Sequence, residues 1–455
     1  MKTKQRSGVV ARYLDRYGEP VVHGLADWVA GWPGALRWCQ VLVVPVCGER
    51  TDFVARIPDP TTTLVIIVVN NSVDSNAAAK EQNRNFVETL TTAATQLQGR
   101  GGMSLLRMDH SGLHVLLVDR YSPGRELPVD GGVGQARKLG ADVAVALSAL
   151  GRLDGPWIFN SDADTHLPAD YFTRIDRLHT AAVAIFPFCH VHGPDSDGHI
   201  TAATLLYEVS LHHYVEGLRS AGSPYAFHSV GSTFAVTVEA YAKVRGFPKR
   251  SAAEDFYMLN KLAKVGPVVE LTGDPIEIDA RISDRVPFGT GAAVSKMVKE
   301  PSLLRSYDFY HPDVFRLLAY WVSSFSALWG NRALGVETAL QRVVEHAPDT
   351  IASKAMVELL THIGARKGVA HGFKQARDPD QFNKQLHDWF DGFRTLKMVH
   401  WLRDHVAASV SLPQLLEIAP CRALKQCCGK QIEWLTATDT ITSDVIARPS
   451  RCAKS

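Results

Sequence analysis

The chain has 455 residues and a net charge of +2, from 49 Lys and Arg against 47 Asp and Glu. Hydrophobic residues make up 46% and charged residues 21%, the balance of an ordinary soluble globular protein. Because opposite charges are interspersed and no basic run occurs, we expect no nucleic-acid partner.

Seven cysteines, an odd number, are too scattered for a disulfide framework in a chain of this size. We therefore expect reduced thiols and a cytoplasmic protein. The cluster around Cys421, Cys427 and Cys428 fits no two-by-two thiolate pattern, so zinc binding there is the less favoured interpretation. No segment reaches the roughly 18–20 apolar residues of a membrane-spanning helix. Residues 314–330 predict a buried helix, with peripheral contact at the inner face of the membrane as the alternative.

Taken in chain order, the predicted elements define four regions. Short helical pieces that carry three tryptophans form an N-terminal helical extension, residues 1–40. Alternating strands and helices then fill residues 41–300, and helical patterns fill 301–445. A polar tail, residues 446–455, ends the chain.

Four continuous apolar runs in the second region predict buried parallel strands. They are VLVVPVCGE (41–49), TLVIIVVNNS (63–72), LHVLLVDRYS (113–122) and WIFNSDAD (157–164). Helical stretches at 76–98 and 134–150 separate them, and the second places Ala136, Leu139 and Val143 on one face. Later strands at 181–191 and within 230–248 extend the sheet region to about residue 290. The alternation predicts an α/β sheet with flanking helices, whose ligands bind beyond the carboxyl ends of the strands.

Two carboxylates one residue apart, Asp162 and Asp164, end the fourth predicted strand. Acids at this spacing can converge on one hard cation, and Mg²⁺ and Mn²⁺ prefer such oxygen ligands together with phosphate oxygens. A cation held in this way neutralises a diphosphate leaving group. The structural alternative is that the two acids belong to a turn before a helix starting near Pro168.

Several motifs in a fixed order resemble the GT-A fold glycosyltransferases, especially family 2, which take sugar from a nucleotide diphosphate. Pro45 and Glu49 match the turn after the first strand, and GVGQARKLG matches the family's helix with Lys138 in place of Asn. The Asp162–Asp164 pair follows, then Arg245-Gly246-Phe247 for a Gly-Gly-Phe turn and Glu254-Asp255 for a Glu-Asp pair. The resemblance covers about 250 of the 455 residues.

The resemblance implies a GT-A fold, a nucleotide-diphosphate-sugar donor, and a Mg²⁺ or Mn²⁺ ion on Asp162 and Asp164. Further residues are expected at the nucleotide-sugar site because they stand at predicted strand ends, on the predicted helix or in the later basic loop: Pro45, Cys47, Glu49, Asn70, Asn71, Gly134, Arg137, Asp162, Arg281 and Arg285. Asn70-Asn71 stands where the family usually has an acid that receives the base N–H. An amide carbonyl can accept the same hydrogen bond, so the base stays open between uracil and guanine.

The segment SAAEDFYMLNKL predicts a catalytic helix start. Ser251 and Glu254 form a capping-box pattern, which gives Glu254 a supporting role and places Asp255 in the first helical turn. The helix dipole favours an ionised Asp255, as a general base requires. The resemblance likewise implies that this Asp is the base of an inverting transferase. The structural alternative is two acids that merely stabilise a helix start.

Other residues are weaker candidates. His228 and Ser232 flank a segment that can face the sugar or the acceptor. Arg281 and Arg285 precede a Gly-rich turn that is interpreted equally well as a lid over the diphosphate or as a surface loop.

The favoured interpretation is an inverting, metal-dependent glycosyltransferase acting on an unidentified acceptor: a saccharide, a small molecule or a lipid-linked molecule. The alternatives are a sugar nucleotidyltransferase, which would need a Gly-rich basic signature after the first strand, and a non-catalytic nucleotide-sugar-binding module. VCGERTDF matches that signature poorly, and retention of both acidic pairs disfavours the non-catalytic module.

Overall fold

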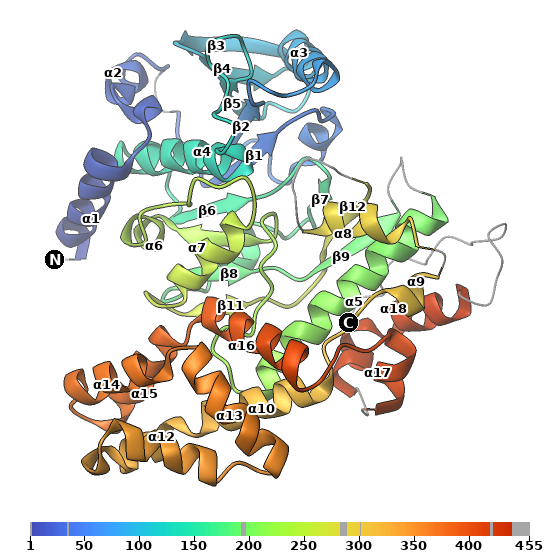
Figure 1. Cartoon of the computed structure of the whole chain (residues 1–455). Helices are drawn as coiled ribbons and strands as arrows, with labels where there is room; N and C mark the ends of the chain where they lie inside the picture. The colour runs from blue at the N-terminus through green and yellow to red at the C-terminus, as the bar shows by residue number, and fades with distance from the viewer. Residues whose placement is uncertain are drawn as a thin grey trace. The chain divides into compact units, whose positions relative to one another are not determined.

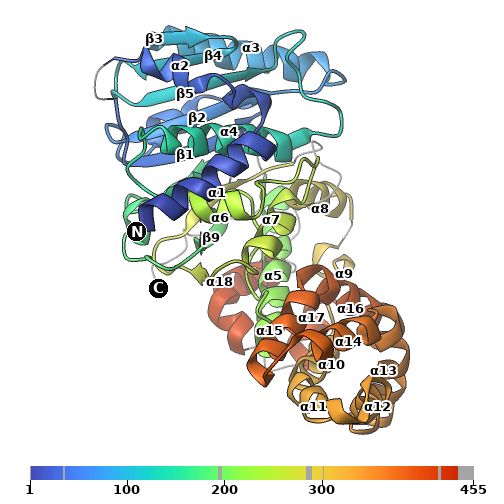
Figure 2. The ribbon, with the colours of Figure 1, turned by 90° about the vertical axis from the view of Figure 1, so that its left-hand side faces the viewer.

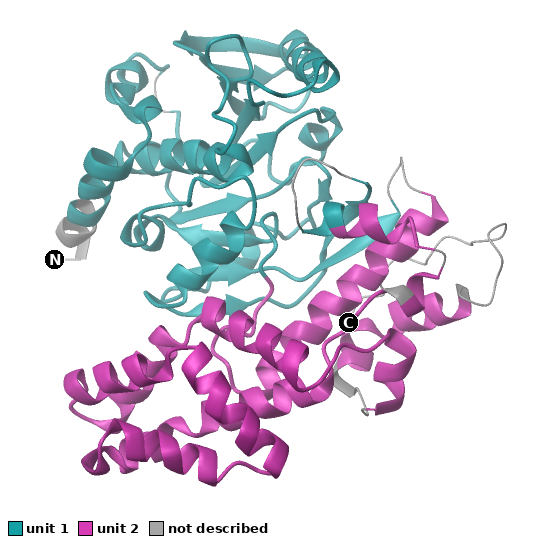
Figure 3. Cartoon of the chain, viewed as in Figure 1, with its two compact units in different colours: residues 1–195, 229–292, 450–455 teal, residues 196–228, 293–449 magenta. Residues whose placement is uncertain are grey.

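The computed structural model describes residues 2–33, 36–192, 197–282, 289–300, 302–418 and 422–438. Contacts divide the chain into two compact units (Figure 3). The first, residues 1–195, 229–292 and 450–455, holds the sheets. The second, residues 196–228 and 293–449, is helical and takes in the long helix α5, Gly198–Ser220.

Four adjacent parallel strands form the centre of the large sheet, and each of the four apolar runs supplies one. They are β1 (Gln40–Val46), β2 (Thr63–Asn70), β5 (His114–Arg120) and β6 (Trp157–Asn160), which lie side by side in the order β6-β1-β2-β5 (Figures 1 and 2). Val43 is in register with Asn160, and Val46 with Val69. The carboxyl ends of these strands therefore share one edge of the sheet, as the sequence predicts.

The complete sheet has nine strands in the order β11-β8-β10-β6-β1-β2-β5-β4-β3. The additional strands are β3 (Ala94–Arg100), β4 (Met103–Met108), β8 (Val183–Ile185), β10 (Phe234–Thr237) and β11 (Val268–Glu270). Of the nine, β4 and β10 run against the others, because each pairs antiparallel with both of its neighbours. The predicted mixed, mostly parallel α/β sheet is confirmed.

The predicted helix at 76–98 is wrong at its carboxyl end. Helix α3 spans Ala77–Thr92, and the chain then forms the β3–β4 hairpin. Gly101 and Gly102 make the turn with φ of +51° and +88°, values that glycine adopts without a steric penalty. The polar, largely exposed residues of β3 suit an edge strand, and their pattern gives a weak strand signal in the sequence.

A small second sheet, in the order β7-β12-β9, lies in the same unit. Its strands are β7 (Thr165–His166), β12 (Ile276–Ala280) and β9 (Phe188–His192). The single strand predicted at 181–191 is therefore two strands, β8 and β9, which belong to different sheets. The break falls at Phe186-Pro187, where proline cannot donate to a ladder.

Helix α4 (Gly132–Ala149) packs along β1 and β2 and is buried over most of its length (Figure 2). The predicted N-terminal helices are present as α1 (Lys2–Tyr17) and α2 (Leu25–Ala30). Lys138 of α4 anchors α1, because its Nζ donates to the Tyr13 hydroxyl at 2.7 Å and to the Tyr17 carbonyl at 2.9 Å. Lys138 also pairs with buried Asp142 at 2.9 Å. The residue that departs from the family's Asn is thus used to hold this chain's own N-terminal helix.

The remaining helices of the first unit are short and border the sheet. They are α6 (Val238–Lys243) and α7 (Glu254–Leu262), with 3-10 turns at Pro20–Val22, Asp52–Arg56 and Thr173–Ile175. No helix starts near Pro168 in the described chain, so Asp162 and Asp164 do not cap one. The structural alternative places the two acids in a turn before a helix near Pro168, and the helix of that alternative is wrong.

The helical unit has its own apolar core. Besides α5, its helices are α9 (Leu303–Ser306), α10 (Pro312–Ser323), α11 (Phe325–Gly330), α12 (Val336–Glu345), α13 (Thr350–His362), α14 (Ala365–Gln375), α15 (Pro379–Trp389), α16 (Gly392–His405), α17 (Leu412–Ile418) and α18 (Arg422–Thr438). Helix α8 (Thr290–Met297) leads into it. The single helix predicted at 314–330 is two helices, α10 and α11, which meet at Ser324. The predicted burial is confirmed, since Trp321 and Phe325 lie in the core. None of the described helices is both long and apolar enough to cross a membrane.

Candidate active site

The acidic turn follows β6 directly and is held by side-chain and main-chain hydrogen bonds. The hydroxyls of Ser161 and Thr165 are 2.6 Å apart, and Thr165 donates to the Asp162 carbonyl at 2.9 Å. The Asp279 N–H of β12 donates to the Asp164 carbonyl at 3.0 Å. Because both ends of the turn are fixed, the carboxylates of Asp162 and Asp164 project from a rigid backbone.

Arg137 joins the acidic turn to the Glu254-Asp255 pair. Its Nη2 donates to Asp162 Oδ1 at 2.7 Å, its Nε to Glu254 Oε1 at 3.0 Å, and its Nη1 to the Ser161 carbonyl at 3.3 Å. Its side chain is only 2% exposed. Burial by itself would lower the pKa of Arg137, but Asp162 and then Glu254 outweigh it and raise that pKa. Arg137 is therefore a buried, permanently charged side chain that links Asp162 to Glu254.

Glycines make room for this link. A Cβ on Gly231 would lie 2.7 Å from Arg137 Nη2, so the chain opposite the guanidinium accepts no side chain there. Gly134, one turn before Arg137, donates its N–H to the Arg250 carbonyl at 3.1 Å. A Cβ on Gly134 would lie 2.6 Å from the carbonyl oxygens of Pro248 and Arg250. The glycine of the Gly-x-x-Arg pattern thus allows α4 to contact the segment that leads into α7.

Helix α7 begins at Glu254, and the predicted capping box is wrong. Its N-cap is Ala253, with φ of +56° and no side-chain cap, and Ser251 is exposed. Glu254 is 4% exposed and uses its carboxylate on Arg137 instead of reaching back to Ser251. A buried guanidinium is a stronger partner for a carboxylate than a backbone N–H, which explains the difference.

Asp255 lies half-buried in the first turn of α7, with its Oδ1 accepting from the Phe256 N–H at 2.7 Å. Burial, followed by the charge of Glu254, raises its pKa to about 7. From the sequence we expect the helix dipole to favour the ionised form of Asp255, but burial and the Glu254 charge outweigh it. The same electrostatic environment includes Arg137 and Asp162, so Asp255 and the acidic turn lie in one site.

Arg281 forms a second cationic bridge in the site. It makes a bidentate pair with Glu49 at 2.9 Å for both bonds, and its Nη2 lies 2.6 Å from Asp164 Oδ2. Burial by itself would lower the pKa of Arg281, but Asp164 and Glu49 outweigh it and raise that pKa. Glu49 after β1, Asp164 after β6 and Arg281 after β12 therefore converge, although they are far apart in sequence. Arg285 lies outside the described residues.

The other predicted strand-end residues lie at the same edge of the sheet. Pro45 is buried in β1 opposite Val68, beyond the last residue paired with β6, so its missing N–H breaks no ladder on that side. Cys47 follows β1 and is half-buried. Asn70 donates its side-chain amide to the Val46 carbonyl at 3.0 Å, which ties the ends of β1 and β2 together.

Asn71 is buried and takes part in a local amide network. Its Oδ1 accepts from Asn83 of α3 at 3.2 Å, and its amide donates to the Ser72 carbonyl at 3.2 Å. Asn83 also accepts from the Gly48 N–H at 2.8 Å through its Oδ1, so one helix residue fixes the loops after both strands. Asn83 was not predicted from the sequence. The sequence marks it only as an amide on a helix face whose other buried residues are apolar.

Three further polar residues, Arg56, His166 and Asp279, lie beside the acidic turn and were not predicted from the sequence. His166 Nε2 lies 2.9 Å from Asp279 Oδ1, and Arg56 Nη1 lies 3.0 Å from His166 Nδ1. The β7–β12 pairing brings His166 and Asp279 together, and the sequence separation of 113 residues hides it. Of the two acceptor candidates, Ser232 is buried in the first unit, and His228 belongs to the helical unit. Burial, followed by the charge of His212, lowers the pKa of His228 to about 3.

The donor set of the acidic turn fits a hard dication. Asp162 meets Arg137 through Oδ1 and Asp164 meets Arg281 through Oδ2, at exposed side-chain fractions of 34% and 16%. Two partly exposed carboxylates on a rigid turn are a ligand set that Mg²⁺ or Mn²⁺ accepts together with phosphate oxygens.

Comparison with known proteins gives a family match over part of the chain that forms this site. Residues 157–299 match the sequence model of the glycosyl transferase family group 2. The matched segment contains the acidic turn, the Glu254-Asp255 pair and Arg281. A search of the curated proteins gives no match to this chain.

Among solved structures, two of Staphylococcus aureus TarS residues 1–349 are similar. The complex with UDP-GlcNAc is 15% identical, covering 78% of this chain and 91% of that chain at a TM-score of 0.35. The second TarS structure is 14% identical, covering 78% and 90% at a TM-score of 0.31. These similarities are too weak to carry a functional argument, which rests on the family match and the site.

Proposed function

We propose that the protein is a glycosyltransferase that moves a sugar from a nucleotide-diphosphate donor to an acceptor hydroxyl with inversion of the anomeric carbon. The match of residues 157–299 to the glycosyl transferase family group 2 model supports this proposal. The observation that carries the proposal is Arg137, a buried cation that holds Asp162 and Glu254 at 2.7 and 3.0 Å. Arg137 therefore connects the Asp162 turn, expected at the diphosphate, to the Glu254-Asp255 pair, expected at the acceptor.

Asp255 is the proposed general base. Inversion requires the acceptor oxygen to attack the anomeric carbon from the face opposite the departing diphosphate, while a base removes the hydroxyl proton. A carboxyl whose pKa is about 7 is well matched to this task, because it is substantially ionised at neutral pH yet basic enough to accept the proton. Glu254 fixes the helix start through Arg137 and keeps the pKa of Asp255 high.

The donor is proposed to bind along the shared edge of the sheet, with the nucleoside beside the ends of β1 and β2 and the diphosphate at the acidic turn. Asn70 and Asn71 offer amide groups near the nucleoside base in place of the family's acid. A Mg²⁺ or Mn²⁺ ion on Asp162 and Asp164 would neutralise the leaving diphosphate. Arg281 carries a positive charge at the same turn and positions Glu49 and Asp164.

The two competing interpretations are weaker. A sugar nucleotidyltransferase needs a Gly-rich basic loop after β1, and this chain has Cys47-Gly48-Glu49 with Glu49 paired to Arg281. A non-catalytic binding module has no need to raise the pKa of a carboxyl beside its ligand site, where Asp255 lies.

The test is a transfer and hydrolysis assay with a panel of UDP- and GDP-sugars and Mn²⁺, comparing the wild type with Asp255→Asn and Asp164→Ala. Asp154→Asn is the matched control, because this exposed acid pairs with Arg37 outside the site. We expect Asp255→Asn to lose turnover by at least about a hundredfold while nucleotide binding, measured by calorimetry, is retained. Asp164→Ala should lose both turnover and Mn²⁺-dependent nucleotide binding.

Product stereochemistry completes the test. With an α-linked donor, proton NMR of the product should show a β-linkage. Full turnover by Asp255→Asn would remove the base assignment, and a retained α-linkage would remove the inverting mechanism. Nucleotide binding that is indifferent to EDTA and to Asp164→Ala would remove the metal.

A further inference from the structure

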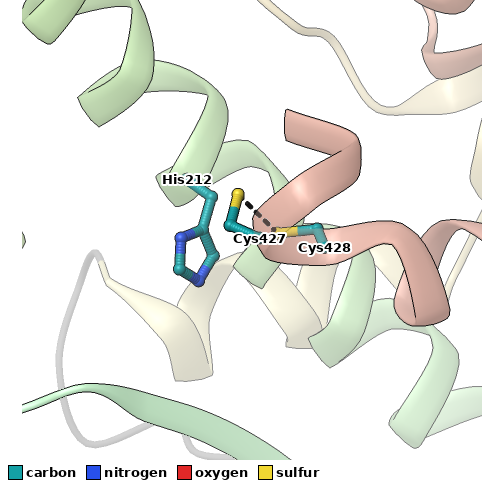
Figure 4. Close-up of side chains that lie close together, drawn as sticks. All are labelled: His212, Cys427 and Cys428. Carbon is teal, nitrogen blue, oxygen red and sulfur yellow. Dashed lines mark hydrogen bonds between the residues drawn. The ribbon is translucent and has the colours of Figure 1, made fainter. Parts of the chain in front are cut away.

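The helical unit contains a cluster of two cysteines and one histidine from helices distant in sequence. His212 lies on α5, and Cys427 and Cys428 lie on α18 (Figure 4). Their ligand atoms all lie within 4.8 Å of one another. The two sulfurs are 3.5 Å apart and share a hydrogen bond, drawn as a dashed line in Figure 4.

The backbone of α18 is distorted where the sulfurs meet. Consecutive side chains on a regular helix point about 100° apart, so adjacent cysteines do not normally share a ligand. Here Cys428 has φ of −126° and ψ of +16°, which interrupts the helix. The interruption turns both sulfurs toward α5 (Figure 4). Cys428 is fully buried in the apolar core between these helices, so its position is fixed by packing.

We propose that His212, Cys427 and Cys428 form a site for Zn²⁺, with solvent as the fourth ligand. Two thiolates and one imidazole are a ligand set that selects zinc over Mg²⁺ or Mn²⁺. In a tetrahedral site with Zn–S bonds of about 2.3 Å, the two sulfurs lie about 3.8 Å apart. The 3.5 Å between Cys427 and Cys428 is close to this value and far from the ~2.05 Å of a disulfide.

The remaining geometry requires only side-chain rotation. The three ligand atoms lie within 4.8 Å of one another, a limit about 1 Å above the nitrogen–sulfur distance of a filled site. His212 is half-buried and packs edge-on against the His228 ring at 4.5 Å, and Cys427 is exposed, so closing the site requires these two side chains to move toward the buried Cys428. Glu208 and Glu216, one turn on either side of His212, place negative charge near the imidazole. Such charge favours a bound cation.

The bound ion would join the first helix of this unit to the last described one. Residues 212 and 427 are 215 positions apart, so no cysteine-spacing pattern reveals the site. From the sequence, zinc binding is the less favoured interpretation because only the C-terminal cysteines are available as ligands. Their third partner comes from α5, and neither Cys421 nor Cys452 is needed. This inference is independent of the proposed transferase mechanism.

The test uses the full chain, reduced and stripped with a chelator, in excess Mg²⁺ to occupy the acidic turn. Titration with Co²⁺ should give thiolate-to-cobalt charge-transfer absorption and the intense visible bands of a tetrahedral ion. Zn²⁺ should displace it at one equivalent per chain. We expect Cys427→Ser and His212→Ala to weaken Zn²⁺ binding at least about tenfold. Cys39→Ser, an exposed cysteine of the other unit, should leave binding unchanged.

Three results would overturn the site: cobalt bands without thiolate charge transfer, wild-type affinity in Cys427→Ser, or an intact mass two hydrogens lower that reports a Cys427–Cys428 disulfide in place of metal. Because Cys427 is exposed, its serine variant should fold, which circular dichroism checks. The cobalt spectrum of the wild type tests the proposal even if His212→Ala does not fold.

Discussion

The pKa of Asp255 predicts a pH profile that can be changed by one substitution. Its rise from 3.8 to about 7 is caused first by burial and then by the charge of Glu254. If Asp255 is the base, kcat/KM should fall on the acid side with an apparent pKa near 7. About a tenth of the enzyme would be active at pH 6 and about nine tenths at pH 8.

Glu254→Gln removes the charge but keeps an amide oxygen that can accept from Arg137 Nε. Because the Glu254 charge raises the pKa of Asp255, the acid limb of the profile should move to lower pH. At pH 6 the variant should then retain a larger fraction of its own maximal kcat/KM than the wild type does. This comparison holds even if the maximal value of the variant is lower. Initial rates across pH 5–9 at subsaturating donor measure this shift, with Asp154→Asn as the control. A limb that stays in place or moves to higher pH would refute the electrostatic coupling.

Three further predictions concern stability. Asp255→Asn should unfold at higher temperature than the wild type at pH 8 but not at pH 5, because the raised pKa of Asp255 makes the folded state lose stability as pH rises from about 4 to 7. Gly134→Ala should cost about 1–3 kcal/mol in urea unfolding and reduce turnover, since its Cβ would meet carbonyl oxygens at 2.6 Å. Lys138→Met should cost about 3–5 kcal/mol, because Asp142 would lose a buried cation at 2.9 Å.

The central sheet could be predicted from the sequence because its strands are buried on both faces. Val, Ile and Leu runs such as those of β1 and β2 have few alternative structures. The β3–β4 hairpin could not be predicted in the same way. Its outer strand is polar and exposed, and it follows α3 after a single residue, so the helical pattern continues into it. Local polarity there reflects the edge of the sheet and not a helix surface.

The acids of the site were predictable as residues, but their partners were not. Asp162, Asp164, Glu254 and Asp255 stand in short motifs that a sequence displays directly. Their pairing with arginines depends on which strand ends meet, and Arg281 reaches Glu49 across 232 residues. The capping box failed for the same reason, because a local rule for Glu254 could not anticipate a buried guanidinium from α4.

Arg137 also explains why helix α4 of this chain combines Gly134 with an arginine one turn later. A guanidinium that is 2% exposed must satisfy its donors inside the protein, and the acids that do so come from two separate segments. Only a close approach of α4 to the segment before α7 brings both within reach, and Gly134 permits that approach. If turnover depends on Asp162 and Glu254 being held by this bridge, Arg137→Lys should lose turnover even though it keeps the charge. An ammonium cannot hold Asp162 and Glu254 in the fixed planar geometry of a guanidinium.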